Sequence, residues 1–171
     1  MAELRDLYDI NHEPTGKTIH KGEPVPDGFY IIVVLIFIEN SDGKFLIQRR
    51  SRQFKDGKLA TTGGHVKTGE TSMEGILEEV REEIGLSLQP SDLTLYFAGR
   101  EDSSHVFFDD YYAKIDIEDI SKLELQDDEV DEVLWMTPDE IYAACENGEF
   151  LSNHVEEFTR LMEWKDKNGN K

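Results

Sequence analysis

The sequence predicts an α/β protein in which helices cover both faces of a central β-sheet. Segments with the composition of strands are interleaved along the chain with segments of helical periodicity. One strand candidate, Phe29 to Glu39, is apolar on both faces, which is typical of a central strand covered on both sides. One helix candidate, Thr71 to Ile84, carries its apolar residues at helical spacing. These observations favour an α/β sandwich.

Strands are predicted where β-branched and aromatic residues gather or where apolar and polar residues alternate. The turn Asn40-Ser41-Asp42-Gly43 joins two such segments and predicts a hairpin. The N-terminal segment, residues 1–28, is predicted to contain both strand and turn. The strand candidates are Thr15 to His20, Phe29 to Glu39, Lys44 to Arg50, Leu93 to Gly99, Val106 to Ile115 and Val130 to Met136.

Three helices are predicted from apolar periodicity and from their end signals. Gly85 is a C-terminal stop for the first helix. Thr137, Pro138 and Glu140 provide a cap, a first-turn proline and a capping-box glutamate for the second. Residues 165–171 are polar and are expected to form a frayed tail. The helix candidates are Thr71 to Ile84, Thr137 to about Asn147, and Ser152 to about Trp164.

The size and charge of the chain limit its function. A length of 171 residues predicts one domain over residues 1–171. The formal net charge of −19 argues against nucleic-acid binding, which needs a basic surface, and against a polybasic membrane anchor. The same charge fits a protein that collects divalent cations.

Cysteine content and hydropathy indicate the cellular setting. The single cysteine, Cys145, excludes an intramolecular disulfide and a cysteine-rich zinc site. The longest apolar run, Phe29 to Ile38, is too short to span a bilayer as a helix. The first six residues contain no apolar signal core. We therefore expect a reducing, cytoplasmic setting without membrane contact.

The first predicted helix carries three carboxylates on one face. With about 100° between successive helical residues, Glu79, Glu82 and Glu83 lie within a sector of about 100°. This sector borders the apolar face, so the carboxylates are expected at the edge of the core, facing a cleft. A solvated acidic face is the structural alternative. A Mg²⁺ or Mn²⁺ site is the functional one, because these cations prefer oxygen ligands.

The spacing of these residues resembles the Nudix box. Counted from Gly64, the chain places a glutamate, an acidic helix and a terminal glycine-aliphatic pair at the positions of that motif, within residues 63–86. The resemblance extends to segments found in Nudix proteins related to isopentenyl-diphosphate isomerase. The matching box residues are Gly64, Glu70, Glu79, Val80, Glu82, Glu83, Gly85 and Leu86, and the further segments are residues 7–9, 14–18, 22–24 and 45–51.

The resemblance implies a fold, a reaction and a set of ligands. The fold is the Nudix-type α/β/α sandwich with a mixed central sheet and flanking helices. The reaction is hydrolysis of a small-molecule diphosphate with Mg²⁺ or Mn²⁺, which would be bound by Glu79, Glu82 and Glu83 and by the backbone carbonyl of Gly63. Which of the three glutamates also acts as base stays open. Glu70 is expected to support the loop and the helix.

One box position departs from the family pattern. Glu78 stands where the family has an arginine that orients the metal-binding carboxylates by an ion pair. Arg81 lies three residues further on and is a candidate partner for Glu78, although it points in a different direction. The departure implies weak metal binding, a repaired ion-pair network or a domain that binds a nucleotide or metabolite without catalysis.

Isomerase activity is the other alternative. The isomerases of this branch have a catalytic cysteine where this chain has Gly63, and a metal-binding histidine near the position of Ile31. Cys145 lies far downstream in a predicted helix and is expected to be a small core residue. These positions count against isomerisation of an isoprenoid diphosphate.

The substrate side of the cleft has fewer signals. Asp109 and Asp110 lie in a predicted strand, where neighbours alternate faces, and Asp110 is favoured as the inward residue. Arg49 and Arg50 end another strand, and we expect one of them to hold a substrate phosphate. The sequence does not specify the substrate. A twofold-symmetric homodimer is the default expectation for such a domain.

Overall fold

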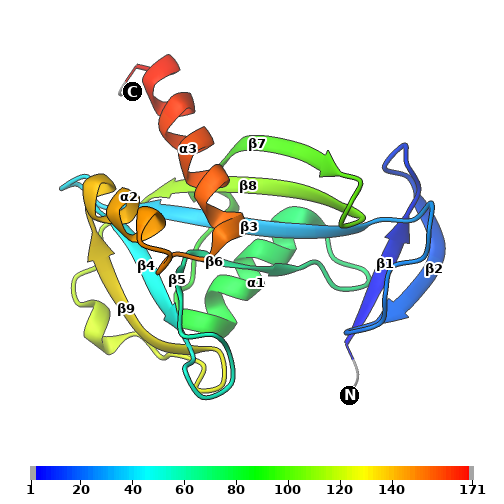
Figure 1. Cartoon of the computed structure of the whole chain (residues 1–171), viewed down its shortest axis with the longest axis horizontal. Helices are drawn as coiled ribbons and strands as arrows, with labels where there is room; N and C mark the ends of the chain where they lie inside the picture. The colour runs from blue at the N-terminus through cyan, green and yellow to red at the C-terminus, as the bar shows by residue number, and fades with distance from the viewer. Residues whose placement is uncertain (1–2, 170–171) are drawn as a thin grey trace.

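The computed structural model describes residues 3–169 and contains a seven-stranded mixed sheet and a separate two-stranded sheet (Figure 1). Along the large sheet the strand order is β5-β4-β3-β8-β7, with β6 paired to β3 and β9 paired to β4. The strands are β1 (Leu4–Tyr8), β2 (Pro14–His20), β3 (Ile31–Glu39), β4 (Phe45–Arg50), β5 (Leu59–Ala60), β6 (Thr62–His65), β7 (Leu93–Glu101), β8 (Val106–Lys114) and β9 (Val130–Met136). The helices are α1 (Ser72–Ile84), α2 (Pro138–Glu146) and α3 (Ser152–Lys167), with short 3₁₀ turns at Pro90–Asp92 and Ile120–Lys122.

Strand β3 lies at the centre of the sheet, as its two apolar faces predict. It pairs in parallel with β8 along its whole length, from Ile31 opposite Val106 to Glu39 opposite Lys114. Every side chain of β3 except Val33 is buried. A strand that is covered on both faces has no polar face to expose, so its sequence is a nearly continuous apolar run.

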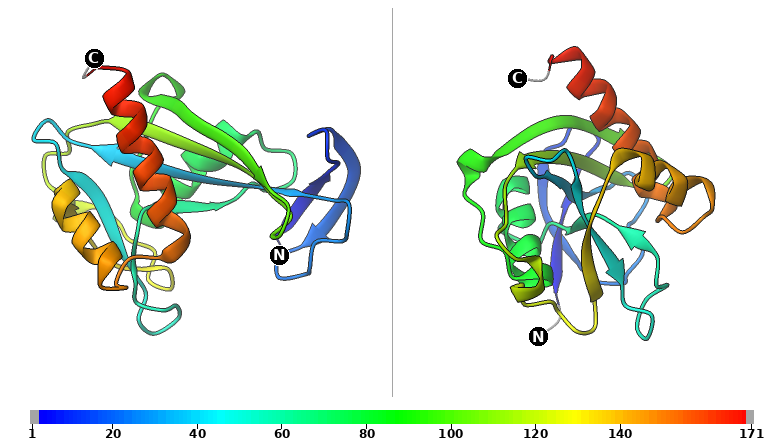
Figure 2. Two further views of the ribbon diagram at one scale, coloured as in Figure 1. Left: turned by 45° about the horizontal axis from the view of Figure 1, so that its top comes forward. Right: turned by 90° about the vertical axis from the view of Figure 1, so that its left-hand side faces the viewer.

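Helices cover both faces of the sheet, which confirms the predicted sandwich (Figure 2). Alternate residues of β3 belong to two different cores, because successive side chains of a strand point to opposite faces. Val34 and its even-numbered neighbours pack with the apolar residues of α1. Leu35 and Phe37 pack with α2 and α3, where Phe37, Phe45 and Phe158 form a cluster of rings.

The predicted hairpin between β3 and β4 forms only next to its turn. Glu39 pairs with Phe45, and beyond that pair the two strands diverge. Strand β4 continues along β9 and β5, while β6 pairs with β3 through Val33 to Ile36. Strands β5 and β6 were not predicted, because β5 has only two residues and β6 contains two glycines, so neither shows a strand pattern. The divergence of β3 and β4 leaves space between the two strands.

The chain end differs from the predicted frayed tail over residues 165–171. Helix α3 extends three residues beyond Trp164, to Lys167. The reason is a tertiary contact, since the Lys165 ammonium pairs with the carboxylate of Glu39, a buried residue at the end of β3. That contact lies far away in sequence and leaves no local signal. Residues 170 and 171 lie outside the described residues.

The N-terminal residues form an arm of two antiparallel strands, β1 and β2, at one end of the molecule (Figure 1). The arm is attached to the body by a bridge between Tyr8 and Tyr30 and by a small core of Leu7, Ile19 and Ile31. Of the helices between residues 3 and 169, none has both the length and the apolarity needed to cross a bilayer.

Candidate active site

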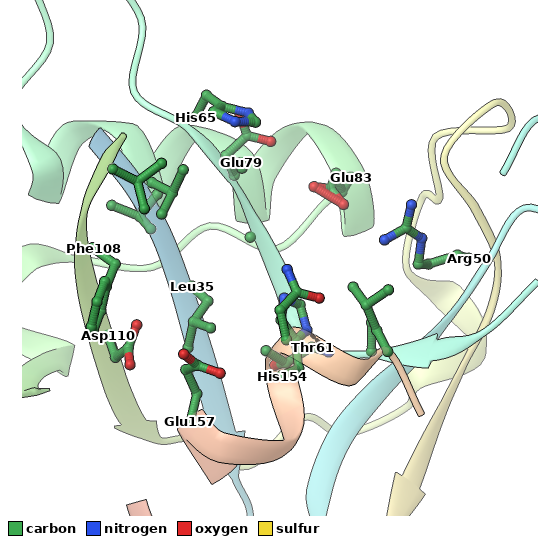
Figure 3. Close-up of a pocket in the computed structure, with 18 of the residues that line it drawn as sticks. Leu35, Arg50, Thr61, His65, Glu79, Glu83, Phe108, Asp110, His154 and Glu157 are labelled. Atoms are coloured by element: carbon green, nitrogen blue, oxygen red, sulfur yellow. Dashed lines mark hydrogen bonds between the residues drawn. The ribbon is translucent and has the colours of Figure 1, made fainter. Parts of the chain in front are cut away.

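A cavity of about 680 Å³ opens where β3 and β4 diverge (Figure 3). One wall is the acidic face of α1 together with β6, and the opposite wall is the first half of β8 with the first turns of α3. Of the sequence-predicted site residues, Gly63, Glu79, Glu82, Glu83, Arg50 and Asp110 line this cavity. The supporting residues Glu70, Glu78 and Arg81 lie outside its lining, behind Glu82 or at the start of the box.

Helix α1 directs its carboxylates toward the cavity because both of its ends are fixed and its apolar face is buried. Thr71 caps the first turn, where its side chain accepts a hydrogen bond from the backbone N–H of Glu74. Gly85 ends the helix in the left-handed conformation, with φ of 68°. Ile76 and Val80 are fully buried against the sheet. The rotation of the helix is therefore set by its core, and the acidic face is directed to the cavity.

The two glycines of β6 allow the strand to lie close to its neighbours. A Cβ on Gly63 would be 2.6 Å from the carbonyl oxygen of Val34. A Cβ on Gly64 would be 2.5 Å from the carboxylate carbon of Glu79. Contacts this short are not tolerated by real side chains. Glu79 can therefore lie directly over β6 only because residue 64 has no side chain.

Glu83 is oriented by a chain of hydrogen bonds from β4 and β6. Gln48 Nε2 donates to Glu83 Oε1 over 3.1 Å, and Gln48 Oε1 accepts from the hydroxyl of Thr62 over 3.1 Å. All three residues are buried. The amide of Gln48 is thus held at one end and fixes the carboxylate at the other.

The residues of this wall fit a divalent cation. Glu83 is buried, and Glu79 beside it is half-buried. The pKa of Glu79 is raised, first by burial and then by the negative charge of Glu83. Burial also raises the pKa of Glu83, against the hydrogen bond from Gln48. Two adjacent carboxylates whose ionisation is opposed by burial and mutual repulsion favour a bound cation, and their oxygens are hard ligands.

Glu82 is engaged by a lysine from the loop between β6 and α1. Lys67 Nζ donates to both carboxylate oxygens of Glu82, over 3.2 and 3.3 Å. Burial alone would lower the pKa of Lys67, but the hydrogen bond to Glu82 and the nearby glutamates raise it. In this arrangement no three Asp, Glu, His or Cys side chains within residues 3–169 already enclose a metal position.

The opposite wall carries a second acidic pair. Asp110 on β8 is only 1% exposed, and its Oδ2 atom has no hydrogen-bond partner in the described structure. The same holds for Oε2 of Glu157 on α3, which also lines the cavity. Burial, followed by the charge of Glu157, raises the pKa of Asp110 to about 8. Buried polar atoms without partners are rare in proteins and point to a missing ligand or water.

The two arginines at the end of β4 have different surroundings. Arg50 lines the cavity, and its Nε lies 3.2 Å from Asp56. Arg49 points away from the cavity, where it donates to the carbonyl of Gly57 over 2.9 Å and to Glu132 over 3.2 Å. Of the two arginines, one of which was expected to hold a phosphate, Arg50 is therefore the one that lines the cavity, because neighbours on a strand face opposite sides.

Several residues of the cavity were missed in the sequence. Gln48 is a polar residue inside an otherwise apolar strand, and this could have marked it. His154 on α3 accepts a hydrogen bond at Nδ1 from the backbone N–H of Thr61, and burial lowers its pKa to about 4. His65 on β6 is likewise kept neutral, since burial lowers its pKa to about 4. His154 and Glu157 carry no local signal, because α3 meets the cavity only in the folded chain.

Comparisons with known proteins agree with this fold. The family model described as NUDIX domain matches residues 30–158. The uncharacterized Nudix hydrolase lmo0368 of Listeria monocytogenes is 34% identical over 151 residues, which cover 85% of this chain and 86% of the relative. The uncharacterized Nudix hydrolase YfcD of Escherichia coli K12 is 32% identical, over 78% of this chain and 72% of the relative.

A solved structure shows the same fold. The crystal structure of DR0079 from Deinococcus radiodurans matches with a TM-score of 0.70 at 24% sequence identity, over 86% of this chain and 91% of that one.

Proposed function

The chain belongs to the Nudix hydrolase family, and from this premise we propose that it hydrolyses an organic diphosphate, such as a nucleoside diphosphate-linked compound, with Mg²⁺ or Mn²⁺. The observation that carries the proposal is one cavity that holds the acidic face of α1, with Glu79, Glu82 and Glu83, together with Arg50. Carboxylates would hold the cation and the arginine would hold a phosphate, which are the two requirements of diphosphate hydrolysis.

The cation would be bound by Glu79, Glu82 and Glu83 and by the backbone carbonyl of Gly63, as the family resemblance implies. When bound, it supplies screening of the diphosphate charge and a lower pKa for the attacking water. One of the three glutamates would also serve as the base that takes a proton from the attacking water. Gln48 would keep the Glu83 carboxylate oriented toward the cation, because the Gln48 amide is itself held by the hydroxyl of Thr62.

The remaining walls position the substrate. The Arg50 guanidinium would bind a phosphate oxygen, and its own partner Asp56 keeps the side chain oriented. Asp110 and Glu157 lie on the opposite wall, where their unpartnered oxygens would form hydrogen bonds with the group attached to the diphosphate. The cavity thus separates a phosphate end from a recognition end.

Isomerisation has no support in the described residues. Cys145 lies on α2 and packs with the core on the α2/α3 face of the sheet, and it is not among the residues that line the cavity. Ile31 is buried in the small core between the arm and the body. Neither residue is placed to act on a substrate in the cavity.

A phosphate-release screen tests the proposed hydrolysis. The purified protein is assayed on nucleoside diphosphate-linked, nucleotide and isoprenoid diphosphate compounds with Mg²⁺ or Mn²⁺, beside the double variant Glu82→Gln, Glu83→Gln. Turnover that needs the metal and is lost in the double variant is the expected result. Glu74→Gln is the matched control, since Glu74 is an exposed acid in the first turn of the same helix. Absence of turnover on every compound would favour a binding domain without catalysis.

A further inference from the structure

Helix α1 carries several negative charges close together. Glu78, Glu79, Glu82 and Glu83 lie on two successive turns of α1, and like charges at these spacings repel. The resemblance to the Nudix box places an arginine at position 78, and this chain has a glutamate there. The substitution removes a cation and adds an anion at the point where a metal-binding carboxylate must be held.

Lys67 contacts both carboxylates concerned. Its ammonium lies 3.2 and 3.3 Å from the two oxygens of Glu82 and 3.9 Å from Glu78 Oε1. About a quarter of the Lys67 side chain is exposed, and about a third of each of the two glutamates. The interaction is therefore less screened by solvent than an ordinary surface pair.

Hydrogen bonds fix the backbone on both sides of Lys67, so the position of its Cα is well defined. The N–H of Val66 donates to the carbonyl of Ile32 over 2.9 Å, and the N–H of Thr68 donates to the carbonyl of Leu4 over 2.9 Å. Val66 is buried and lies against Gly75 of α1. Strands β1 and β3 thus hold the loop on both sides of the lysine.

Arg81 touches the same two glutamates but in a different setting. Its guanidinium lies 3.4 Å from Glu78 and 3.9 Å from Glu82, and 60% of its side chain is exposed. An exposed pair of this kind contributes little, because solvent screens it and the long side chain loses entropy when it is held. Arg81 is a weaker candidate for the missing cation than Lys67.

We propose that Lys67 takes over the role of the arginine of the Nudix box. The positive charge then comes from the loop before α1, and position 78 of the helix carries the negative charge of a glutamate. Lys67 is a positioning residue: it holds the carboxylate of Glu82 and neutralises Glu78 beside it. The effect on catalysis rests on the proposed hydrolase function. The ion-pair arrangement itself does not, and it can be tested without any substrate.

The test is a mutant cycle between positions 67 and 78. The full-length chain is compared as wild type, Lys67→Met, Glu78→Arg and the double variant Lys67→Met, Glu78→Arg. Unfolding temperature is measured in EDTA, and Mn²⁺ affinity is measured by electron paramagnetic resonance of free Mn²⁺. Arg81→Met removes the other cation that contacts the same two glutamates and serves as the comparison. Lys67→Arg retains a positive charge at the loop position.

We expect Lys67→Met to weaken Mn²⁺ binding about tenfold or more, which is typical when a group that orients a metal ligand is lost. Its unfolding temperature in EDTA should fall by about 3 °C. In the Glu78→Arg chain the same substitution should change Mn²⁺ affinity less than threefold, since the helix then provides the cation. Arg81→Met and Lys67→Arg should each stay within about threefold of the wild type.

Two results would overturn the proposal. One is a Mn²⁺ affinity of Lys67→Met equal to that of the wild type. The other is an equal loss in both backgrounds, because it would show that positions 67 and 78 are not coupled. A fall in unfolding temperature alone, with Mn²⁺ affinity unchanged, would reduce Lys67 to a structural role. If the wild type binds no Mn²⁺ and releases no phosphate, the proposed function fails, and the unfolding temperatures still decide whether the two positions are coupled.

Discussion

At the scale of single residues, Gly64 and Glu79 depend on each other. The carboxylate of Glu79 lies where a side chain on residue 64 would be, and this brings it from α1 to the edge of the cavity. The glycine of the motif is thus explained by the space that the Glu79 carboxylate occupies, not by an unusual backbone conformation.

This contact gives a prediction about two adjacent glycines. Gly64→Ala should displace Glu79 and reduce activity about a hundredfold, because small misplacements of catalytic groups have effects of that size. Its free energy of unfolding should change little, since the end of a glutamate can move. Gly63→Ala should instead lower the free energy of unfolding by about 1–3 kcal/mol, because it meets the backbone of Val34.

Activity assays and urea denaturation of the two variants measure the contrast. If Gly64→Ala kept full activity, Glu79 would not act from the position described here.

Asp110 gives a prediction about pH. Its pKa in the folded chain is about 8, well above the ordinary value for aspartate, because the carboxyl is buried near Glu157. Between about pH 4 and pH 8 the unfolded chain has lost this proton and the folded chain retains it, so Asp110 lowers stability progressively as the pH rises. Asp110→Asn cannot ionise. It should therefore gain stability over the wild type as the pH rises, by about 1–3 kcal/mol at pH 8.

Urea denaturation at about pH 5 and pH 8 measures this gain. Asp109→Asn, on the other face of β8, controls for the loss of a charge on the strand. A difference between Asp110→Asn and wild type that is the same at both pH values would contradict the prediction. Higher stability together with lower activity would mark Asp110 as a residue kept for substrate binding.

At the scale of elements, helix α1 is the part that local sequence defines best. The structure confirms its predicted glycine end and gives the helix within one residue of the predicted range, with Thr71 as the N-cap where the prediction had the first helical residue. Its C-terminal end also carries a tertiary contact. A Cβ on Gly85 would lie 2.8 Å from the backbone carbonyl oxygen of Glu124.

The ends of α1 and α2 provide a matched pair of glycines. Gly85 and Gly148 both have positive φ, 68° and 80°, but nothing lies within 4 Å of a Cβ on Gly148. Gly148→Ala should cost only the conformational strain, about 1 kcal/mol, whereas Gly85→Ala should cost about 1–3 kcal/mol more because of the contact with Glu124. Denaturation midpoints compare the two variants. Equal losses would mean that the Glu124 segment moves away freely.

At the scale of the whole molecule, the net charge is −19, and Glu79, Glu82 and Glu83 place part of this negative charge on one wall of the cavity. Binding of a cation to the folded chain should therefore raise its stability. Mn²⁺ at a hundredfold excess over its dissociation constant should add about 2.7 kcal/mol to the free energy of unfolding, and EDTA should remove the gain.

A general salt effect also stabilises an acidic protein, so NaCl at matched ionic strength is the control. The variant Glu79→Gln, Glu83→Gln should lose the response to Mn²⁺ and keep the response to NaCl. An equal gain from both salts would indicate screening of the surface and no specific site.

The sequence by itself determined the features that arise within one segment. The apolar run of β3, the box spacing and the caps of α1 and α2 are encoded by neighbouring residues, and the structure reproduces them. The membership of Glu79, Glu82 and Glu83 in one helix face follows from helical geometry alone.

Only the tertiary structure decided which distant residues meet. The partial pairing of β3 with β4 opens the cavity, and this depends on the competing strand β6. The register of β4 turns Gln48 and Arg50 to the cavity and Arg49 away from it. Lys67 reaches Glu82 across fifteen residues, and α3 brings Glu157 beside Asp110. Such contacts depend on how the elements pack, and packing is a property of the whole chain with no local pattern in the sequence.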